Sequence, residues 1–392
     1  MKELIGKKVV MKRILFLIPS FCAGGAERQL ILLASGLHQA GYSVKIAVFY
    51  SGGILESEAK ATVIQIVNLG RGPWDQIPFL FRLVRLIRSE RPDILHSYLS
   101  VPNVWAAFVK LLNPRTKVIW GIRISGLPLK KYGLRARLDG RIETLLSGIP
   151  DWIICNSHAG MLHALEKGYP KEKMSVVPNG IDTQMFFPDR KSGLKLREQW
   201  KIAQNEKLIG MVGRMDPVKD YPNFLRAASL LVQERLNIRF VCVGCGPDQY
   251  VQEYRELAGS LHLEPFLVWA GEQENMFSVY NALDLLVLSS NGEGFSNVIT
   301  EAMACGVPCV ATNVGDAAQL IGALGEIVPP GDSEALKRSI LALLNRLEVE
   351  EASLKNEVAR RIADQFSTAN LIFRTADILN RVLPESSVSG SS

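Results

Sequence analysis

The chain has 392 residues, of which 47% are hydrophobic and 21% charged, and its formal net charge is +6. This length predicts two domains, each with its own hydrophobic core, and the composition is that of a soluble globular protein. No apolar run reaches the ~18 residues of a membrane-spanning helix. No groove-reading motif or platform of basic and aromatic residues indicates nucleic-acid binding.

The expected elements begin with a short strand at 13–18. Lys12 and Arg13 precede an apolar core of five residues that Pro19 ends, which is too short for a signal peptide. We expect residues 1–11 to be a loose extension. Further strands are expected in the first half at 44–49, 63–67, 93–97, 117–121 and 151–155, and helices separate most of them, for example at 26–40 and 76–90.

The same alternation restarts after Asp182. Strands are expected near 207–212, 238–243, 266–269, 284–288 and 308–311, with helices near 221–233, 247–260 and 297–305. Alternating strands and helices predict parallel sheets covered on both faces, with ligands bound at the carboxyl ends of the strands. We therefore expect two doubly wound α/β domains, 12–185 and 195–365, that face each other across an interdomain cleft, and a disordered tail at 384–392.

A glycine turn joins a strand to a helix at residues 292–308. Glu293 lies between two glycines, Ser296 or Asn297 can cap the helix, and Gly306 with Pro308 ends it. The free N–H groups at such a helix start bind phosphate, so the backbone of Gly294, Phe295, Ser296 and Asn297 is expected to meet an anion. A carboxylate there would repel phosphate and instead accepts hydrogen bonds from hydroxyls. Phosphate beside hydroxyls indicates a sugar nucleotide.

Two cations follow the strand expected at 207–212. Arg214 and Lys219 are five positions apart on one turn, where they can grip a diphosphate. Taken alone, the two cations also fit a solvated loop, but the carboxylates Glu293 and Glu301 further along the chain favour a role in ligand binding. A glycosidase mechanism would use two carboxylates and has no need of these cations.

Two features of the first half lie at strand ends. Gly24-Gly25 permits close approach of a ligand to the backbone, although such a pair also makes plain turns. His96 ends a strand, and a lone histidine is often structural. Cys242-x2-Cys245 and Cys305-x3-Cys309 have the spacing of a zinc site, but their apolar surroundings favour buried free thiols in a reducing cytoplasm.

Residues 293–301 resemble the Glu-x7-Glu signature of the retaining family 4 glycosyltransferases (glycosyl transferases group 1), which have the GT-B fold. The resemblance covers about residues 12–383. Further landmarks occur in the family's order: Gly24-Gly25-Ala26-Glu27, His96, Pro178-Asn179-Gly180-Ile181-Asp182, and Gly213-Arg214 followed by Lys219. One departure is Asp316-Ala317, where many relatives carry a glutamate after Val314-Gly315.

The resemblance implies a metal-independent enzyme without a cofactor, whose donor is a UDP- or GDP-linked sugar. It implies that Glu293 holds the donor's sugar hydroxyls, that Glu301 binds ribose, and that His96 lies near the reacting face of the sugar. Arg214 and Lys219 would stabilise the leaving diphosphate in place of a metal ion. For Glu301, a helix carboxylate favoured by the dipole is the plainer alternative. The last helix, 366–383, would cross back to the first domain.

The charge is unevenly divided along the chain. Residues 1–185 contain 25 Lys and Arg against 13 Asp and Glu, a net charge of +12, and the remainder carries −6. Arg82, Arg85, Arg88 and Arg91 form one basic stripe, and a second cluster comprises Arg123, Lys130, Lys131, Arg135, Arg137 and Arg141. Such stripes attract anionic lipid, but they also occur as solvated helix faces.

Together these features predict a cytoplasmic hexosyltransferase, peripheral on the inner face of the cytoplasmic membrane. Its acceptor would be a glycan or lipid-linked hydroxyl, used to make cell-surface polysaccharide or lipopolysaccharide. Two alternatives are a sugar-nucleotide 2-epimerase of the same fold and a non-catalytic nucleotide-sugar-binding subunit. Intact Arg214, Lys219, Glu293 and Glu301 argue against the second.

Overall fold

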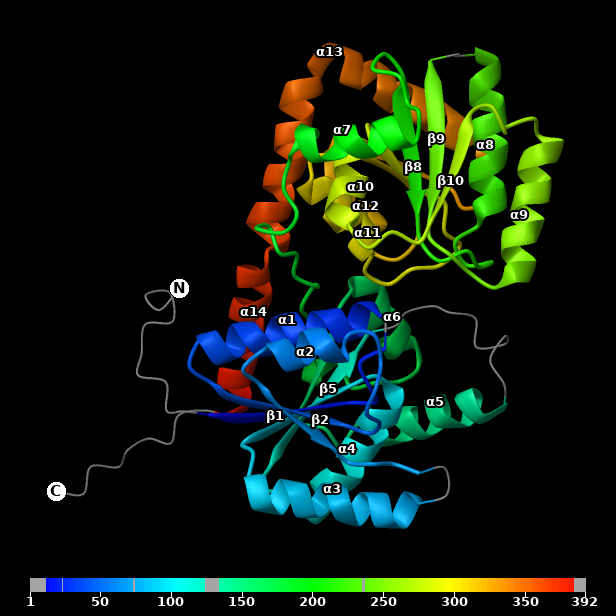
Figure 1. Cartoon of the computed structure of the whole chain (residues 1–392). Helices are drawn as coiled ribbons and strands as arrows, with labels where there is room; N and C mark the ends of the chain where they lie inside the picture. Colours follow the sequence, from blue (N-terminus) through cyan, green and yellow to red (C-terminus); the bar gives the residue numbers. More distant parts are fainter. Residues whose placement is uncertain (1–11, 23, 73–74, 124–133, 235–236, 384–392) are drawn as a thin grey trace. The chain divides into compact units, whose positions relative to one another are not determined.

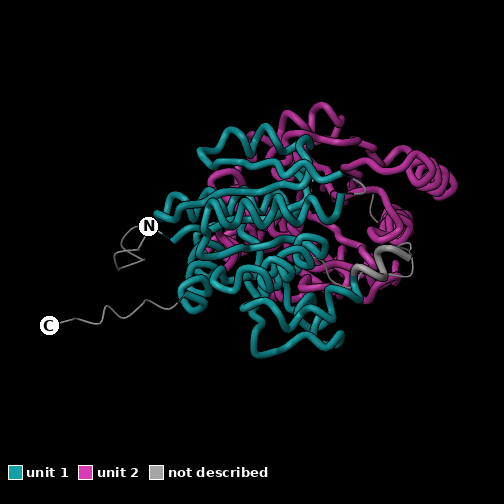
Figure 2. Tube along the Cα trace, turned by 90° about the horizontal axis from the view of Figure 1, so that it is seen from below, with its two compact units in different colours: residues 1–180, 368–392 teal, residues 181–367 magenta. Residues whose placement is uncertain are grey.

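The computed structural model describes residues 12–383 apart from 23, 73–74, 124–133 and 235–236, and only the backbone of 134–139. The expected N-terminal extension and C-terminal tail lie outside the described residues. The chain divides into two compact units, residues 1–180 with 368–392 (unit 1) and residues 181–367 (unit 2), which Figure 2 distinguishes by colour. No helix in the described part of the chain combines the length and apolarity needed to span a bilayer.

Unit 1 is built on a seven-stranded parallel sheet with the order β3-β2-β1-β4-β5-β6-β7. Figure 1 shows this sheet between helices α1 and α2 on one side and α3 and α4 on the other. Its strands are β1 (Arg13–Ile18), β2 (Ser43–Val48), β3 (Gln65–Asn68), β4 (Ile94–Tyr98), β5 (Lys117–Ile122), β6 (Trp152–Cys155) and β7 (Met174–Val176). Its helices are α1 (Gly25–Gln39), α2 (Glu56–Ala61), α3 (Gln76–Glu90), α4 (Ser100–Leu112), α5 (Leu134–Leu146), α6 (His158–Glu166), η3 (Lys171–Lys173) and α14 (Thr368–Val382).

Two hydrophobic layers cover the sheet of unit 1. Side chains of α1, α2 and α14 form one core layer, and those of α3, α4 and α6 form the other. The C-terminal helix α14 packs closely on α1, because a Cβ atom at Gly36 would lie only 2.1 Å from the Ile372 side chain. A residue from the far end of the sequence therefore completes the core of the first unit.

Unit 2 has a six-stranded parallel sheet with the order β10-β9-β8-β11-β12-β13. Its strands are β8 (Lys207–Val212), β9 (Ile238–Val243), β10 (Leu267–Gly271), β11 (Leu285–Leu288), β12 (Cys309–Thr312) and β13 (Glu326–Val328). Its helices are α7 (Arg190–Gln199), α8 (Tyr221–Glu234), α9 (Asp248–Ser260), α10 (Met276–Ala282), α11 (Asn297–Ala304), α12 (Ala317–Ile321), η4 (Gly322–Leu324) and α13 (Ser333–Phe366). The expected pair of doubly wound parallel-sheet domains is thus confirmed.

The boundary between the units differs from the expected one, which lies between a first domain that ends at 185 and a second that begins at 195. Residues 187–193 are polar and linker-like, but Asp189 caps α7 by accepting a hydrogen bond from the Lys191 N–H. The helix then packs on α10 so tightly that a Cβ atom at Gly193 would lie 2.1 Å from the Asn281 carbonyl oxygen. The chain instead enters unit 2 at Ile181, which pairs in a parallel bridge with Ser367, the last residue of that unit.

Candidate functional site

The strand order of unit 2 creates a switch point between β8 and β11. From β8 the chain continues through β9 and β10 on one side, and β11, β12 and β13 lie on the other. The loops after β8 and β11 therefore leave neighbouring strands at their carboxyl ends, which is where doubly wound sheets bind ligands. Arg214 and Lys219 lie in the first loop and Glu293 in the second.

A carboxylate that the sequence reasoning missed shapes the loop after β8. Asp216 accepts hydrogen bonds from the backbone N–H groups of Val218 (2.9 Å) and Lys219 (3.2 Å). Its second oxygen accepts from Nε of Arg214 at 2.7 Å, although 74% of the Arg214 side chain is exposed. The buried Ser289 Oγ donates to the Asp220 carbonyl at 2.9 Å and so ties this loop to the end of β11. The turn is fixed, while the Arg214 guanidinium stays accessible to a ligand.

Lys219 and Glu293 meet directly across the switch point. Lys219 Nζ lies 2.5 Å from Glu293 Oε1, and Ser290 Oγ donates to the same oxygen at 2.8 Å. The two side chains are only 19% and 13% exposed, so each charge compensates the other where solvation is poor. The structure thus brings together, from two loops, the cation predicted to hold phosphate and the carboxylate predicted to hold hydroxyls.

The glycine turn is supported from behind by the loop after β12. Gly315 has φ +58, and a Cβ atom there would lie 2.4 Å from the Gly294 carbonyl oxygen, which also accepts from the Asp316 N–H at 3.0 Å. Ser296 is the N-cap of α11. Phe295 is buried and its ring lies 6.0 Å from that of Phe366. The predicted residues from Gly294 to Asn297 therefore form a rigid start to α11, with the free N–H groups of a helix N-terminus.

Glu301 lies one turn into α11 and has a partner that the sequence did not indicate. Tyr280 of α10 donates its hydroxyl to Glu301 Oε2 at 2.7 Å. Burial raises the pKa of Tyr280 well above its usual value, and the neighbouring Glu301 charge adds to the shift. The phenol therefore remains a donor at all ordinary pH values and orients the Glu301 carboxylate. No motif links these two helices, so only the fold could show the pair.

His96 occupies a different position from the one expected. β4 continues to Tyr98, so His96 lies inside the strand and its side chain is fully buried. Its ring lies between those of Phe16 (5.3 Å) and Tyr98 (4.9 Å), and neither ring nitrogen has a hydrogen-bond partner among the described residues. Burial lowers the pKa of His96 well below its usual value, and the positive charge of Arg123 adds to this, so the imidazole is neutral.

The predicted site residues are distributed over both units. Gly25 begins α1 in unit 1, directly after the Gly24 N-cap. His96 lies on β4, which pairs with β1, the strand that precedes α1. The other eight lie in unit 2: Arg214, Lys219, Glu293, Gly294, Phe295, Ser296, Asn297 and Glu301. The four cysteines proposed as zinc ligands are free thiols, three of them buried, and no cluster of metal-binding side chains occurs in the described part of the chain.

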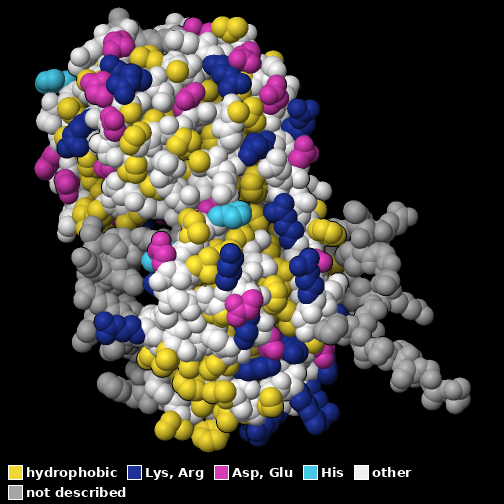
Figure 3. All heavy atoms as spheres, turned by 180° about the vertical axis from the view of Figure 1, so that it is seen from behind, with side chains coloured by type: hydrophobic (Ala, Val, Ile, Leu, Met, Phe, Trp, Pro, Cys, Tyr) yellow, Lys and Arg dark blue, Asp and Glu magenta, His cyan; other side chains and the backbone are white. Residues whose placement is uncertain are grey.

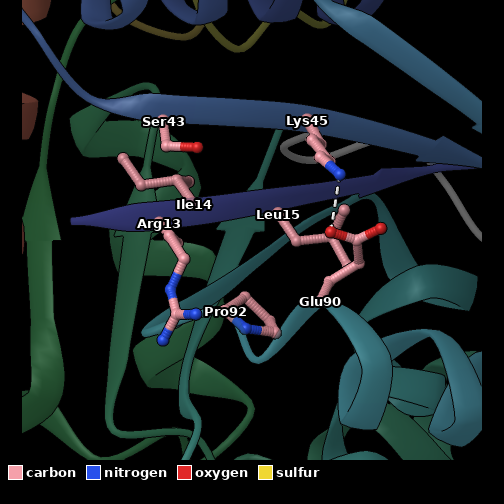
Figure 4. A pocket seen from close by; sticks show the side chains of 7 residues that line it. All are labelled: Arg13, Ile14, Leu15, Ser43, Lys45, Glu90 and Pro92. Atoms are coloured by element: carbon pink, nitrogen blue, oxygen red, sulfur yellow. Dashed lines mark hydrogen bonds and ion pairs between the residues drawn. The ribbon is translucent and has the colours of Figure 1, made fainter. Parts of the chain in front are cut away.

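A small hollow at the other end of the unit 1 sheet is not a candidate site. It lies at the amino ends of β1 and β2, away from the loops where ligands bind (Figure 4). Lys45 forms an ion pair there, with Nζ 2.6 Å from Glu90 Oε2. The lining residues are Arg13, Ile14, Leu15, Ser43, Lys45, Glu90 and Pro92.

Two families match adjoining parts of the chain. The family described as Glycosyltransferase Family 4 matches residues 23–185, and that described as Glycosyl transferases group 1 matches residues 206–346. The chain is a group 1 glycosyltransferase. The resemblance to this family is thereby confirmed, whereas retention of configuration and metal independence remain predictions.

Curated relatives agree with this assignment, and a solved structure shows the fold. The glycosyltransferase is 24% identical to N-acetyl-alpha-D-glucosaminyl L-malate synthase of Bacillus anthracis, over 83% of this chain and 84% of that protein. It is 25% identical to the capsular polysaccharide biosynthesis glycosyltransferase CapM of Staphylococcus aureus, over 78% and 81%. The structure of Anabaena HepE in complex with UDP superposes with a TM-score of 0.84 at 22% identity, covering 94% of this chain and all of that one. The fold of the glycosyltransferase is therefore GT-B, as predicted.

Proposed function

We propose that the enzyme moves a hexose from a UDP- or GDP-linked sugar to a hydroxyl of a glycan or lipid-linked acceptor, in the synthesis of cell-surface polysaccharide or lipopolysaccharide. The observation that carries this proposal is the Lys219–Glu293 pair at the switch point of unit 2. It supports the proposal because the cation proposed for the diphosphate lies 2.5 Å from the carboxylate proposed for sugar hydroxyls. The bound UDP of HepE, and the polysaccharide role named for CapM, support a nucleotide sugar and a glycan product.

The proposed reaction retains configuration at the anomeric carbon. The bond from that carbon to the phosphate oxygen breaks, and a bond to the acceptor oxygen forms on the same face. The leaving phosphate oxygen takes the proton of the acceptor hydroxyl. Lys219 and Arg214 stabilise the charge that accumulates on the diphosphate, Glu293 holds the sugar hydroxyls, and Glu301, oriented by Tyr280, holds the ribose.

The first experiment is a thermal-shift screen of UDP-, GDP- and ADP-sugars, followed by an assay of nucleotide release. A ligand at about 100 times its Kd adds about 2.7 kcal/mol of stability. Nucleotide release that requires an acceptor supports the transferase, and NMR of the product then reports its anomeric configuration. Release of a free epimeric sugar nucleotide would identify the 2-epimerase. Tight binding without turnover of any acceptor would identify the non-catalytic subunit.

Activity is expected to persist in excess chelator. Arg214 and Lys219 already supply positive charge at the diphosphate, which is the task of a divalent ion in other transferases. The measurement is turnover after dialysis against EDTA, with and without added Mg²⁺ or Mn²⁺. Activity that is lost on dialysis and restored by either ion would contradict this mechanism.

Attachment to an anionic membrane is proposed for one face of unit 1. Arg85 and Arg88 of α3 are exposed, and unit 1 also exposes large apolar side chains on α3 (Ile77, 70%; Phe81, 70%), at the end of α4 (Leu111, 62%; Leu112, 51%) and on α5 (Leu145, 84%). Figure 3 shows apolar side chains gathered beside Lys and Arg at the end where Figure 1 draws α3. An apolar face flanked by cations fits an anionic bilayer surface. We therefore propose a peripheral enzyme on the cytoplasmic face of the membrane.

The expected basic residues need correction. Arg82 is bound to Asp75 and to the carbonyls of Leu69 and Gly70, so it does not belong to a free stripe. Arg123 stacks on Tyr98. Lys130 and Lys131 lie outside the described residues, as do the side chains of Arg135 and Arg137.

The double variant Arg85→Ser/Arg88→Ser is expected to bind anionic vesicles roughly 30-fold more weakly, since each cation near the surface contributes about 1 kcal/mol. The measurement is co-sedimentation with vesicles of anionic or neutral lipid at low and physiological salt. Lys191→Ser/Lys195→Ser is the matched control, because it removes two exposed cations from a helix of unit 2. An equal loss of binding to anionic vesicles in both double variants, or binding to neutral vesicles alone, would contradict the assignment of this face.

A further inference from the structure

Buried polar groups without partners gather at the carboxyl ends of β4, β5 and β6 in unit 1. The atoms without a hydrogen-bond partner among the described residues are both ring nitrogens of His96, Tyr98 Oη, Arg123 Nε and Asn156 Oδ1. His96 and Tyr98 are two apart on β4 and share a face. Tyr98 of β4 is paired with Gly121 of β5, and Ile122 of β5 is paired with Cys155 of β6. Arg123 and Asn156, which directly follow β5 and β6, therefore lie level with each other. Buried polar atoms are nearly always hydrogen-bonded, and a cluster of exceptions indicates a site that a ligand completes.

Arg123 is the charged member of this cluster, and it forms no ion pair in the described part of the chain. Its guanidinium lies 4.2 Å above the Tyr98 ring, and Nη1 donates to Asn179 Oδ1 at 3.4 Å. Other half-buried cations of unit 1 face carboxylates: Lys45 faces Glu90, and Lys110 and Lys117 both face Asp151. The positive charge of Arg123 therefore has no carboxylate partner among the described residues and is available to a ligand.

The backbone is adapted to hold Arg123 in this place. A Cβ atom at Gly121 would lie 2.9 Å from the Ser97 carbonyl oxygen, 3.3 Å from the Tyr98 ring and 3.5 Å from Arg123 Nε. A glycine is thus needed for the guanidinium to fold over the ring. Stacking fixes the plane of the fork before a ligand arrives, which lowers the entropy cost of binding.

We propose that Arg123, together with Tyr98 and Asn156, binds an anionic group of the acceptor, either a carboxylate or a phosphate. The guanidinium fork matches two oxygens of either group. Tyr98 Oη and Asn156 Oδ1 can take up hydroxyls beside it. This inference rests on the proposed function, because it assigns the anion to the acceptor.

The first test compares acceptors in matched pairs, with the same sugar carrying either a neutral methyl group or a phosphate or carboxylate. The wild-type enzyme is expected to show a KM at least tenfold lower for the anionic member, and Arg123→Ala to bring the ratio of the two KM values close to one. Arg123→Lys keeps the charge without the fork and should retain part of the preference. Lys45→Ala, which removes a paired cation at the opposite end of the sheet, should leave the ratio unchanged. A ratio that persists in Arg123→Ala would overturn the proposal.

The second test does not depend on turnover. In an Arg214→Ala/Lys219→Ala background, where the cations of the donor site are absent, inorganic phosphate or succinate is expected to raise the unfolding midpoint by roughly 2–4 °C over sodium chloride of equal ionic strength. A further Arg123→Ala change should abolish the shift. A shift with phosphate alone indicates a phosphate group on the acceptor, a shift with succinate alone indicates a carboxylate, and a shift with both indicates a site that takes either group. No shift with either anion in the double variant would overturn the proposed site. Acceptor turnover without anion preference would refute this inference and leave the proposed function intact.

Discussion

Lys219→Ala is expected to lower kcat by on the order of 10²–10³, the effect of removing preorganised charge stabilisation from a transition state. Lys219 lies at the switch point of unit 2 with 19% of its side chain exposed, where its charge would act at low dielectric on the departing diphosphate of the proposed donor. Arg214→Ala is expected to act in the same direction. The measurement is steady-state turnover with the donor identified in the thermal-shift screen, alongside circular dichroism to show that folding is intact.

Lys337→Ala is the matched control for this change. Lys337 is also in unit 2, its side chain is 16% exposed against 19% for Lys219, and it too is paired, with Glu234 and Glu334. It should keep full activity. The double variant Lys219→Ala/Glu293→Ala separates two roles of the lysine. Recovery of activity in that variant would mean that Lys219 serves only to neutralise Glu293, and the diphosphate assignment would then be wrong.

Glu293→Gln and Glu301→Gln are expected to damage different steps. Glu293 should act on the sugar, so its variant loses turnover by on the order of 10²-fold and keeps its affinity for the free nucleotide. Glu301 should act on the ribose, so its variant weakens free nucleotide and sugar nucleotide alike, by about 1.5–3 kcal/mol for a hydrogen bond to a charged group. Calorimetry with the nucleotide and with its sugar conjugate distinguishes the two.

Tyr280→Phe tests the assignment of Glu301 from the other side. It removes the hydroxyl that donates to Glu301 Oε2 and leaves the carboxylate and the packing of the ring in place. Nucleotide affinity should fall by less than in Glu301→Gln, and turnover at saturating donor should be retained.

If Glu293→Gln loses affinity for the free nucleotide while Glu301→Gln retains it, the two roles are reversed.

The parts of the site that the sequence predicted are those that follow from the geometry of parallel sheets. Lys219 and Glu293 were expected at one site because each follows a strand of the same sheet, and the structure places them 2.5 Å apart. Asp216 and Tyr280 are not predicted from the sequence, because their roles depend on hydrogen bonds that neither residue spacing nor composition indicates. Arg123 was grouped with surface charges, since its stacking on Tyr98 depends on the register between β4 and β5.

Errors in the fold also have local causes. β4 runs to Tyr98, so a histidine expected at the strand end is buried inside it. The segment 187–193 has the composition of a linker, but capping by Asp189 and the buried ion pair between Arg197 and Asp284 (2.8 Å) draw it into unit 2. A run of polar residues indicates a loop only where its side chains have no hydrogen-bond or ion-pair partners in the fold. The sequence alone does not show those partners.

The parallel bridge between Ile181 and Ser367 brings the two ends of unit 2 side by side. The matching ends of unit 1 also adjoin, because a Cβ atom at Gly180 would lie 3.0 Å from the Cα atom of Thr368. Residues 181–367 thus have the topology of a cassette whose removal leaves a gap that a few residues can close. Transplanting this cassette between relatives would test whether donor preference moves with residues 181–367.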